Sequence, residues 1–441
     1  MKNAQPNIIY IICHDLGKHL GCYGAEVYSP NLDRFAEEGV KFTNMFCNAP
    51  ACSPSRGCGM TGMYSHTNGL MGLVNCGWSM PESTPTIVDY LNDAGYETVH
   101  VGLQHERYSV EANRYQIHGD DTFEERLVEN AVGNAIKYLE SRKGSTTPFY
   151  LNVVTHEVHA TIWQNTFMPE RLKVYQDDYP DKPYIPRYVP DVPALREVML
   201  KFQACIRYFD KQIQRLFDAV ERLGYKENTL VIFTTDHGIG NVRAKGTLYD
   251  RGTEIAYMMQ MPGTIGSGEV FSDLTQNIDI VPTLLEAAGL EIPSTVQGKS
   301  FWKKLIGQDY TPHREIFTER NYHGDTYDPM RSVRTERYHY IKNFAENPKK
   351  EWLPHEVPYM NDTYKWWYVE LWPEFTLPRD KEELFDVVND PDEFINLAYD
   401  PAYQEIKAEL SRKLDQWMHD TKDPLLEGDI PDKLNGWPDK K

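Results

Sequence analysis

The chain has 441 residues, of which 41% are hydrophobic and 25% are charged, and this balance is ordinary for a soluble globular protein. Its 46 basic and 65 acidic residues give a net charge of −19, which argues against nucleic acid as a partner. No apolar run reaches the roughly 18 residues that a membrane helix needs, so no membrane partner is expected. A chain of this length predicts one large domain and a smaller one.

The seven cysteines include no Cys-x-x-Cys pair, which argues against both a disulfide framework and a zinc cluster. The N-terminus lacks the basic segment and the small-residue cleavage site of a signal peptide. We therefore expect a cytoplasmic protein as the chain is written, or a periplasmic or secreted one if a leader has been removed. Nothing in the sequence sets the oligomeric state.

Short apolar runs alternate with amphipathic stretches in the N-terminal two thirds of the chain. The apolar runs, which have the length of buried strands, are residues 7–13, 97–102, 149–154 and 229–235. The amphipathic stretches, which have helical spacing, are residues 31–38, 86–94, 125–141 and 195–223. This alternation predicts an α/β fold, with a large and mostly parallel sheet sandwiched by helices.

The pattern changes near residues 305–315. Beyond this point we expect shorter strands at residues 315–318 and 338–343 and a final helix at residues 401–418. The sequence therefore predicts a catalytic α/β domain at residues 1–309. A smaller α+β domain with antiparallel strands is predicted at residues 310–441.

Polar residues follow each of the four predicted strands. They are His14 and Asp15, then His105, then His156 and His159, and finally Asp236 and His237. Because ligands of such sheets bind beyond the carboxyl ends of the strands, we expect these side chains to meet at one edge.

The stretch ACSPSRGCGMTG, residues 51–62, contains a further candidate. Pro54 is favoured in the first turn of a helix, and a neighbouring serine can cap that end. The free N–H groups of the helix start would then face Cys52, with Arg56 within one turn, and such a place attracts an anion. From these residues alone, Cys52 is either a buried structural thiol or a nucleophile in an anion site.

The order Cys-x-Pro-Ser-Arg-x-x-x-Met-Thr-Gly closely resembles the signature of the sulfatase family. Further phrases resemble the same family, namely Thr235-Asp-His-Gly238, Lys245-Gly-Thr-Leu-Tyr-Asp250 and Glu383-Leu-Phe-Asp386. The resemblance implies an alkaline-phosphatase-like fold and a Cys52 that a maturation enzyme converts to formylglycine. It also implies one divalent cation, Ca²⁺ in most members, bound by Asp15, Asp236, His237 and the modified Cys52.

Other phrases are similar to the heparan N-sulfatase (sulfamidase) branch of that family. They include residues 184–191, YIPRYVPD, and residues 416–424, QWMHDTKDP. This likeness implies a small sulfated saccharide as substrate, with the N-sulfate of glucosamine as the leading bond.

Two positions depart from the family pattern. His14 stands where sulfatases usually have an aspartate, so it is either a fourth ligand of a kind that suits softer transition metals, or a residue that only hydrogen-bonds near the metal. With His14 and His237 in the site, Mn²⁺, Mg²⁺ or Zn²⁺ is possible beside Ca²⁺. Leu103 stands where the family commonly has a lysine that touches the sulfate, and Lys18 or Arg107 could take its place.

The resemblance also implies roles for individual side chains. Arg56, Lys245 and His105 would add positive charge around the sulfate, and His159 would be the general acid for the leaving group. Residues His156, His323 and Arg331 are candidate substrate contacts. The run Trp366-Trp-Tyr368 is either packing or a platform for a sugar ring.

Three functions stay open at this point. The first is a sulfatase that acts on a sulfated sugar, either on the N-sulfate or on an O-sulfate. The second is a phosphonate or phosphodiester hydrolase of the same superfamily. The third is a protein that binds sulfated glycan without cleaving it, suggested by Leu103, although the intact Cys52 phrase argues against it.

Overall fold

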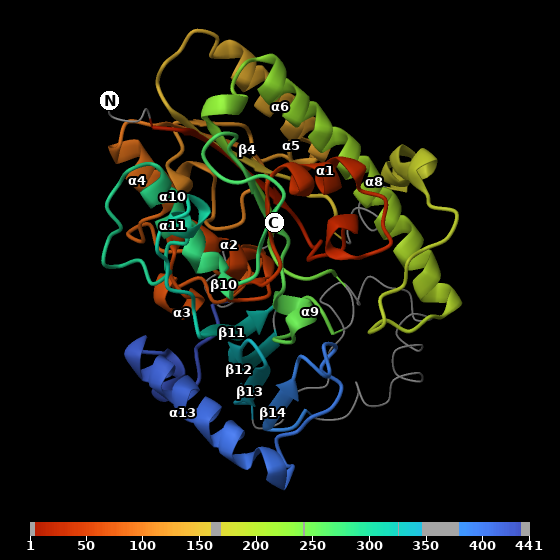
Figure 1. Cartoon of the computed structure of the whole chain (residues 1–441), viewed down its shortest axis with the longest axis vertical. Coiled ribbons are helices and arrows are strands. Elements are labelled where there is room, and N and C mark those ends of the chain that lie inside the picture. The colour runs from red at the N-terminus through yellow and green to blue at the C-terminus, as the bar shows by residue number, and fades with distance from the viewer. Residues whose placement is uncertain (1–4, 160–168, 241–242, 325, 346–378, 434–441) are drawn as a thin grey trace.

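The computed structural model describes residues 5–159, 169–240, 243–324, 326–345 and 379–433. Figure 1 shows a larger part, in which helices surround a sheet, and a smaller part below it, in which further strands lie beside helix α13 Gln404–Asp420. Within the described residues, we find no helix with the length and apolar character required to cross a membrane.

An eight-stranded sheet forms the centre of the larger part, in the order β5-β4-β6-β1-β7-β8-β2-β9. Strands β4, β6, β1 and β7 are parallel neighbours, whereas β8 runs antiparallel to β7 and to β2. Their bounds are β1 Asn7–Cys13, β4 Glu97–Gly102, β6 Phe149–Val154 and β7 Thr229–Thr235, followed towards the edges by β5 Ile117–His118, β8 Tyr257–Gln260, β2 Val40–Phe42 and β9 Glu269–Phe271. The mostly parallel α/β sheet is thus confirmed, and the four predicted strands are its adjacent central members.

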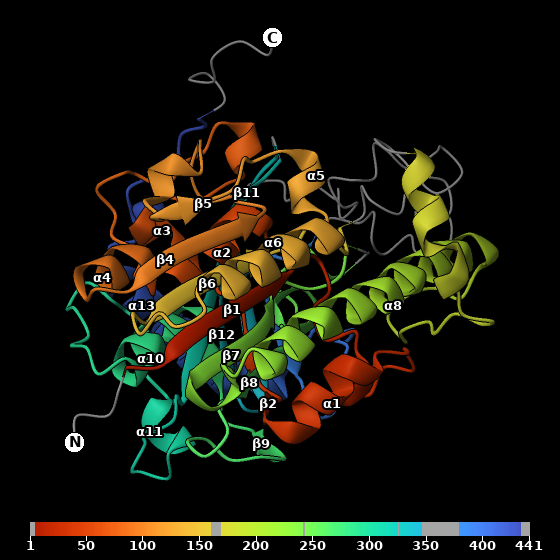
Figure 2. The ribbon, with the colours of Figure 1, turned by 90° about the horizontal axis from the view of Figure 1, so that it is seen from above.

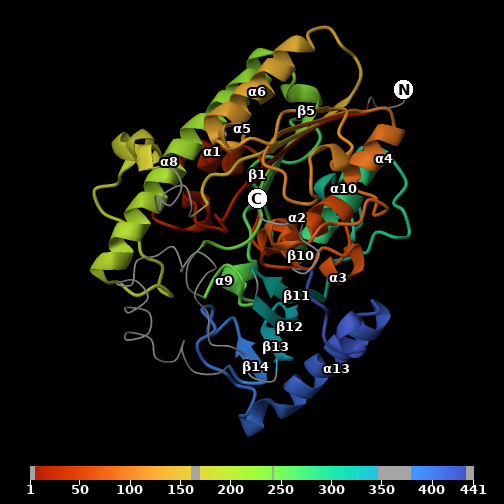
Figure 3. The same cartoon turned by 180° about the vertical axis from the view of Figure 1, so that it is seen from behind.

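Strand β1 shows why helices cover both faces of this sheet. Its alternate side chains enter two different cores, with Ile9 and Ile11 in one and Ile8 and Ile12 in the other. The first core is closed by α1 Pro30–Glu38, α6 Val128–Ser141 and α8 Pro193–Arg222. The second is closed by α2 Cys52–Thr61, α4 Ile87–Asp93, α10 Ile280–Ala287 and α11 Trp302–Leu305. Figures 2 and 3 show the two layers of helices from above and from behind.

One predicted helix, at residues 125–141, is divided in the structure into α5 Phe123–Arg126 and α6. Leu127 between them has an extended backbone, with ψ of 139°. The freed N–H of Val128 donates to the buried carboxylate of Glu157 at 2.8 Å. A contact from a distant part of the chain therefore replaces a helical hydrogen bond, which the local pattern could not predict.

The smaller part is an antiparallel sheet in the order β11-β12-β13-β14, packed against α13. The bounds are β11 Glu315–His323, β12 Thr326–Thr335, β13 Tyr338–Asn343, β14 Glu382–Asp386 and α13 Gln404–Asp420. The predicted division at residues 309 and 310 falls in the connection between α11 and β11.

The two parts share a hydrophobic core. Cys58 and Tyr64 from the larger part pack in one cluster with Val333 and Trp417 from the smaller part. Cys58 belongs to α2, the helix that begins at Cys52. The C-terminal part therefore helps to fix the helix that carries the candidate nucleophile.

Candidate active site

The candidate residues lie where the central strands end. His14 and Asp15 follow β1, and Asp236 and His237 follow its neighbour β7. Asp15 has a φ of 52°, a left-handed backbone that is uncommon outside glycine and found often at functional sites. This turn directs the Asp15 N–H to the Asp236 Oδ1 atom at 2.9 Å. The two aspartates are thereby held side by side.

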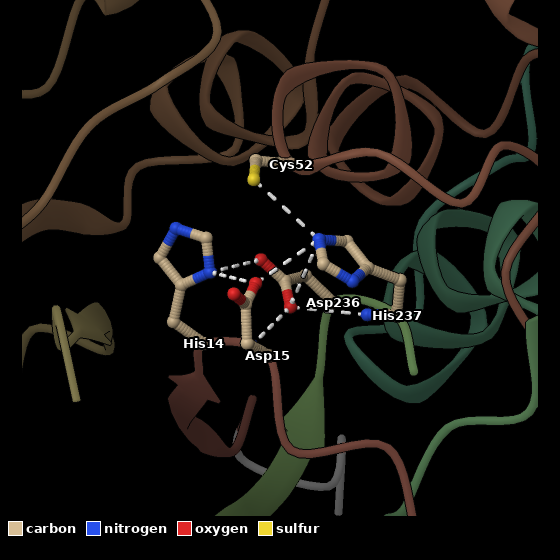
Figure 4. Close-up of side chains that lie close together, drawn as sticks. All are labelled: His14, Asp15, Cys52, Asp236 and His237. Atoms are coloured by element: carbon tan, nitrogen blue, oxygen red, sulfur yellow. Dashed lines mark hydrogen bonds and ion pairs between the residues drawn. The ribbon is translucent and has the colours of Figure 1, made fainter. Parts of the chain in front are cut away.

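Figure 4 shows that His14, Asp15, Asp236 and His237 converge below Cys52. His14 Nδ1 lies 2.8 Å from an oxygen of Asp15 and 3.0 Å from an oxygen of Asp236. His237 Nε2 lies 3.3 Å from Asp15 Oδ1 and 3.4 Å from Cys52 Sγ. The neighbouring charges hold the pKa of both aspartates below its usual range, although burial acts in the opposite direction.

Cys52 is the first residue of α2, and Ala51 before it has an extended backbone. The cap predicted from a neighbouring serine is wrong, because Ser55 Oγ donates instead to the carbonyl of Asp236 and Ser53 Oγ accepts from Val74 N–H. Burial alone raises the pKa of the Cys52 thiol, but the charges of Lys245 and His14 and a hydrogen bond with His105 hold it well below its usual range. The sulfur thus lies in a buried and strongly cationic place.

Three cationic or protonatable side chains surround the aspartates. Lys245 Nζ lies 2.9 Å from Asp15 Oδ2 and 3.2 Å from His159 Nε2. Arg56 donates from Nη2 to Asp236 Oδ2 at 3.1 Å, and its buried Nη1 has no hydrogen-bond partner among the described residues. Lys245, Arg56 and His159 come from three different loops or helices, so only the folded chain brings them together.

The residues present fit a divalent cation. One ligand atom each from His14, Asp15, Cys52, Asp236 and His237 lies within 4.8 Å of all the others, and all five residues are buried. Carboxylate oxygens suit hard cations and imidazoles suit transition metals, so this donor set admits Ca²⁺ as well as Mn²⁺, Mg²⁺ or Zn²⁺. The carboxylates of Asp15 and Asp236 already attract positive charge. Against the effect of burial, they raise the pKa of His14 well above its usual range.

Neither candidate for the missing lysine reaches the site. Leu103 is buried in an apolar core, and Lys18 Nζ bonds instead to Glu254 at 2.6 Å. Arg107 is fully buried, and its guanidinium donates to the carbonyls of Pro81 and Thr84, among others. The idea that Lys18 or Arg107 replaces the lysine is therefore wrong. The amine beside the aspartates belongs to Lys245.

The histidines that follow β6 and β4 also lie at this edge. The ring of His14 is 4.6 Å from that of His159 and 5.9 Å from that of His156, between centroids. Burial holds the pKa of His105 below its usual value, and its buried Nδ1 has no hydrogen-bond partner within the described part of the chain. A neutral His105 beside Cys52 can therefore accept a proton.

The candidate substrate contacts in the smaller part separate into two cases. The ring of His323 lies against Gly246, where an added Cβ would come within 2.8 Å of Nδ1, so His323 borders the loop that carries Lys245. Arg331 is fully buried, and it bonds to Asp423 at 2.9 Å and to Asn321 at 2.9 Å. The prediction that Arg331 contacts substrate is wrong, because its guanidinium binds partners inside the smaller part. Trp366-Trp-Tyr368 lies outside the described residues.

Sequence reasoning missed the side chains that support the site from behind. Asn277 donates to Ser55 Oγ at 3.0 Å and to the Ser55 carbonyl at 2.9 Å. Ser55 in turn holds the backbone of Asp236. No local pattern marks Asn277, since only the tertiary fold brings it to α2.

The arrangement can activate a nucleophile and stabilise an anion at one place. Cys52 provides the reacting position, Lys245 and Arg56 provide fixed positive charge, and His159 and His105 can give or take protons on either side of it. Preorganised charge of this kind in a buried site is a large source of rate acceleration. These features suit the hydrolysis of an anionic ester or amide of a strong acid.

Two family profiles match the chain. One, described as "Sulfatase", covers residues 6–290, which is more than half of the chain. The other, described as "N-sulphoglucosamine sulphohydrolase, C-terminal", covers residues 238–364.

Individual proteins match over nearly the whole chain. An ulvan-active sulfatase of Formosa agariphila is 28% identical and covers 97% of this chain and 83% of its own length. The human N-sulphoglucosamine sulphohydrolase is 25% identical and covers 98% of this chain and 94% of its own length. A solved structure of a protein with its substrate D-glucosamine-2-N,6-O-disulfate has a TM-score of 0.71 at 20% identity, over 95% of this chain and 98% of that one, and shows a shared fold.

Proposed function

This chain belongs to the sulfatase family of hydrolases, and we propose that it removes a sulfate group from a small sulfated sugar. The observation that carries the proposal is the position of Cys52. Its Sγ lies 3.4 Å from His237 Nε2, beside two aspartates and within the electrostatic influence of Lys245. A sulfate ester or sulfamate placed there would have its sulfur next to residue 52 and its oxygens next to fixed positive charge.

The modification and the cation that the family uses fit this place. Conversion of Cys52 to formylglycine by a maturation enzyme would supply a hydrated aldehyde, with one hydroxyl to attack sulfur and a second to drive release of sulfate. A divalent cation held by Asp15, Asp236 and His237, with His14 as a fourth ligand, would lower the pKa of the attacking hydroxyl and neutralise sulfuryl oxygens.

The chain's own residues would then divide the proton transfers. His159, whose side chain is 14% exposed, lies on the more open side of the site and would protonate the leaving amine or alcohol. His105, on the Cys52 side, would accept the proton of the second hydroxyl. Lys245 and Arg56 would bind the sulfate oxygens and hold Asp15 and Asp236 in place.

For the bond that is cleaved, we propose the N-sulfate of glucosamine. The match of residues 238–364 to the C-terminal profile of N-sulphoglucosamine sulphohydrolase supports this choice, as does the human relative that spans 98% of the chain. The second candidate is an O-sulfate of another glycan, because an ulvan-active sulfatase is 28% identical over 97% of the chain.

A hydrolysis panel tests the proposal. Protein from a host that makes formylglycine is given N-, 6-O-, 3-O- and 2-O-sulfated monosaccharides and, in parallel, phosphodiesters, and released sulfate or phosphate is measured. We expect the fastest release from N-sulfoglucosamine, with the Cys52→Ala protein as the blank. Fast release from an O-sulfated sugar and none from the N-sulfated one would overturn the N-sulfate assignment. Preference for the phosphodiesters would overturn the sulfatase activity itself.

A further inference from the structure

We propose that a basic, tyrosine-lined pocket next to the active-site loops binds an anionic saccharide unit at a place separate from the reacting centre. This lateral pocket has a volume of about 400 Å³, and its lining includes Lys18, Lys41, Arg187, Arg251, Tyr23 and Tyr188. Such a volume lies within the usual range for small-ligand sites. The choice of a sulfated sugar as the ligand rests on the proposed function.

The lateral pocket is positive although the chain as a whole is strongly negative. Four basic side chains line it, against the two carboxylates of Glu254 and Asp392. Burial lowers the pKa of His19, a further lining residue, to about 3, so this ring adds no charge at neutral pH. An excess of positive charge in a concave place attracts anions selectively, even on an acidic protein.

Two of the cations are held by carboxylates at short distances, and the other two keep donors that a ligand could use. Lys18 Nζ lies 2.6 Å from Glu254, and Arg251 lies 3.1 Å from Glu254 and 3.0 Å from Asp392. Lys41 Nζ donates to the carbonyl of Cys22 at 2.6 Å, and no described carboxylate lies within 4.0 Å of it. Arg187 keeps 73% of its side chain exposed while one of its nitrogens lies 3.0 Å from Asp392. Lys41 and Arg187 therefore have donors left for sulfate or carboxylate oxygens.

Aromatic rings lie beneath these charges. Lys41 Nζ is 5.7 Å from the centre of the Tyr23 ring, and the Arg251 guanidinium is 5.5 Å from the centre of the Tyr188 ring. Tyr184, which is only partly buried, also lines the pocket, so apolar ring surface for the C–H side of a sugar adjoins cations that can bind its acidic substituents. This combination favours an anionic saccharide over a free inorganic anion.

The lateral pocket shares a wall with the catalytic loops, but its lining residues do not include Cys52, Asp15 or Asp236. Gly17 and Ile239 line it, and the Gly17 N–H donates to the His237 carbonyl at 2.9 Å. Lys18 follows directly, and its Nζ lies 2.6 Å from Glu254. A sugar in this pocket would thus be held beside the catalytic loops as a separate molecule.

Binding to the full chain with Cys52→Ser, which cannot turn over substrate, tests the inference. The probe is a size-defined heparin tetrasaccharide, its fully desulfated form is the control ligand, and calorimetry gives the number of binding events. We expect two events. In the combined variant Lys41→Gln and Arg187→Gln, one event should weaken at least fivefold, whereas Arg215→Gln, the same change at an exposed arginine of α8, should leave both intact.

A second variant covers the case in which the double variant folds poorly. Ala25→Glu adds a carboxylate to the pocket lining without removing a side-chain hydrogen bond, and it should weaken the same event. With an intact Cys52, both variants should turn over 4-nitrophenyl sulfate at the parent rate. Failure of the proposed sulfatase activity can therefore be distinguished from failure of the proposed binding in the lateral pocket. Equal affinities in all variants would overturn the lateral pocket, whereas a single event that the pocket variants weaken would keep the pocket and count against binding of this saccharide at the reacting centre.

Discussion

The catalytic edge of the large sheet and the joint to the C-terminal part both bury charged side chains, but they arrange them differently. At the catalytic edge the charges converge, because Asp15 contacts His14, Lys245 and His237 at distances of 2.8–3.3 Å. At the joint the closest contacts are pairs, with Arg334 at 2.9 Å from Asp250 and His339 at 2.6 Å from Glu393, although His339 also lies 3.6 Å from Asp250. Charges that neutralise each other in pairs exert little electrostatic field on a third group. Converging charges instead form a site that can bind a third group and polarise it. Burial of charge therefore does not by itself mark a function.

Removal of the nucleophile from the converging charges of the catalytic edge should give the largest loss of activity. Cys52→Ala should abolish turnover of every sulfated substrate, and it should change the free energy of unfolding by about 1 kcal/mol or less. Mass spectrometry of the parent from a maturation-competent host should show the aldehyde at position 52. Full activity with an unmodified thiol would contradict the mechanism.

Removal of the proton donor should come next, and its effect should depend on the leaving group. His159→Ala should slow cleavage of a sulfamate by about 10²–10⁴-fold, because an amine leaves poorly unless it is protonated. An activated aryl sulfate needs no such proton and should lose much less. The rates of both substrates are measured side by side, with the exposed His118→Ala as control. Equal losses for the two substrates would remove His159 from this role.

The buried charges inside the smaller part should respond in stability and not in chemistry. Arg331→Met leaves Asp423 buried without its partner, which should cost about 3–5 kcal/mol in the free energy of unfolding. The pair of Arg222 and Glu140, in which both side chains are exposed, offers a control, because Arg222→Gln should cost less than about 1 kcal/mol. Denaturant unfolding gives both values. A fall in kcat of the folded Arg331→Met protein, with unchanged stability, would place Arg331 in the chemistry after all.

The smallest expected effect is a change of metal preference at the catalytic edge. His14→Asp replaces an imidazole by a carboxylate, so activity restored by Ca²⁺ after chelation should rise relative to that restored by Mn²⁺ or Zn²⁺, by roughly tenfold. Chelation should remove activity from both proteins. An unchanged order of metals would mean that His14 is not a ligand.

The sequence predicted the central strands and the groups that follow them because both depend on local pattern. Continuous apolar runs identified β1, β4, β6 and β7, and the parallel order placed His14, Asp15 and His237 at one edge. The break at Leu127 could not be predicted, because it depends on a carboxylate from Glu157. The role of Arg331 was predicted wrongly for the same reason, because its partner Asp423 comes much later in the chain, after helix α13. Local pattern predicts elements, while the partners of buried charges follow only from the tertiary fold.

The burial of α2 has a consequence for the biosynthesis of the protein. All ten residues of this helix are buried, and Cys52 is 3% exposed. An enzyme that converts the Cys52 thiol must grasp it together with neighbouring backbone, and the folded chain offers neither. The conversion proposed for Cys52 would therefore have to take place while the segment is still extended, between its synthesis and the docking of the C-terminal part on α2. Modification and folding would then compete to set the yield of active protein, so slower folding during production should raise the modified fraction.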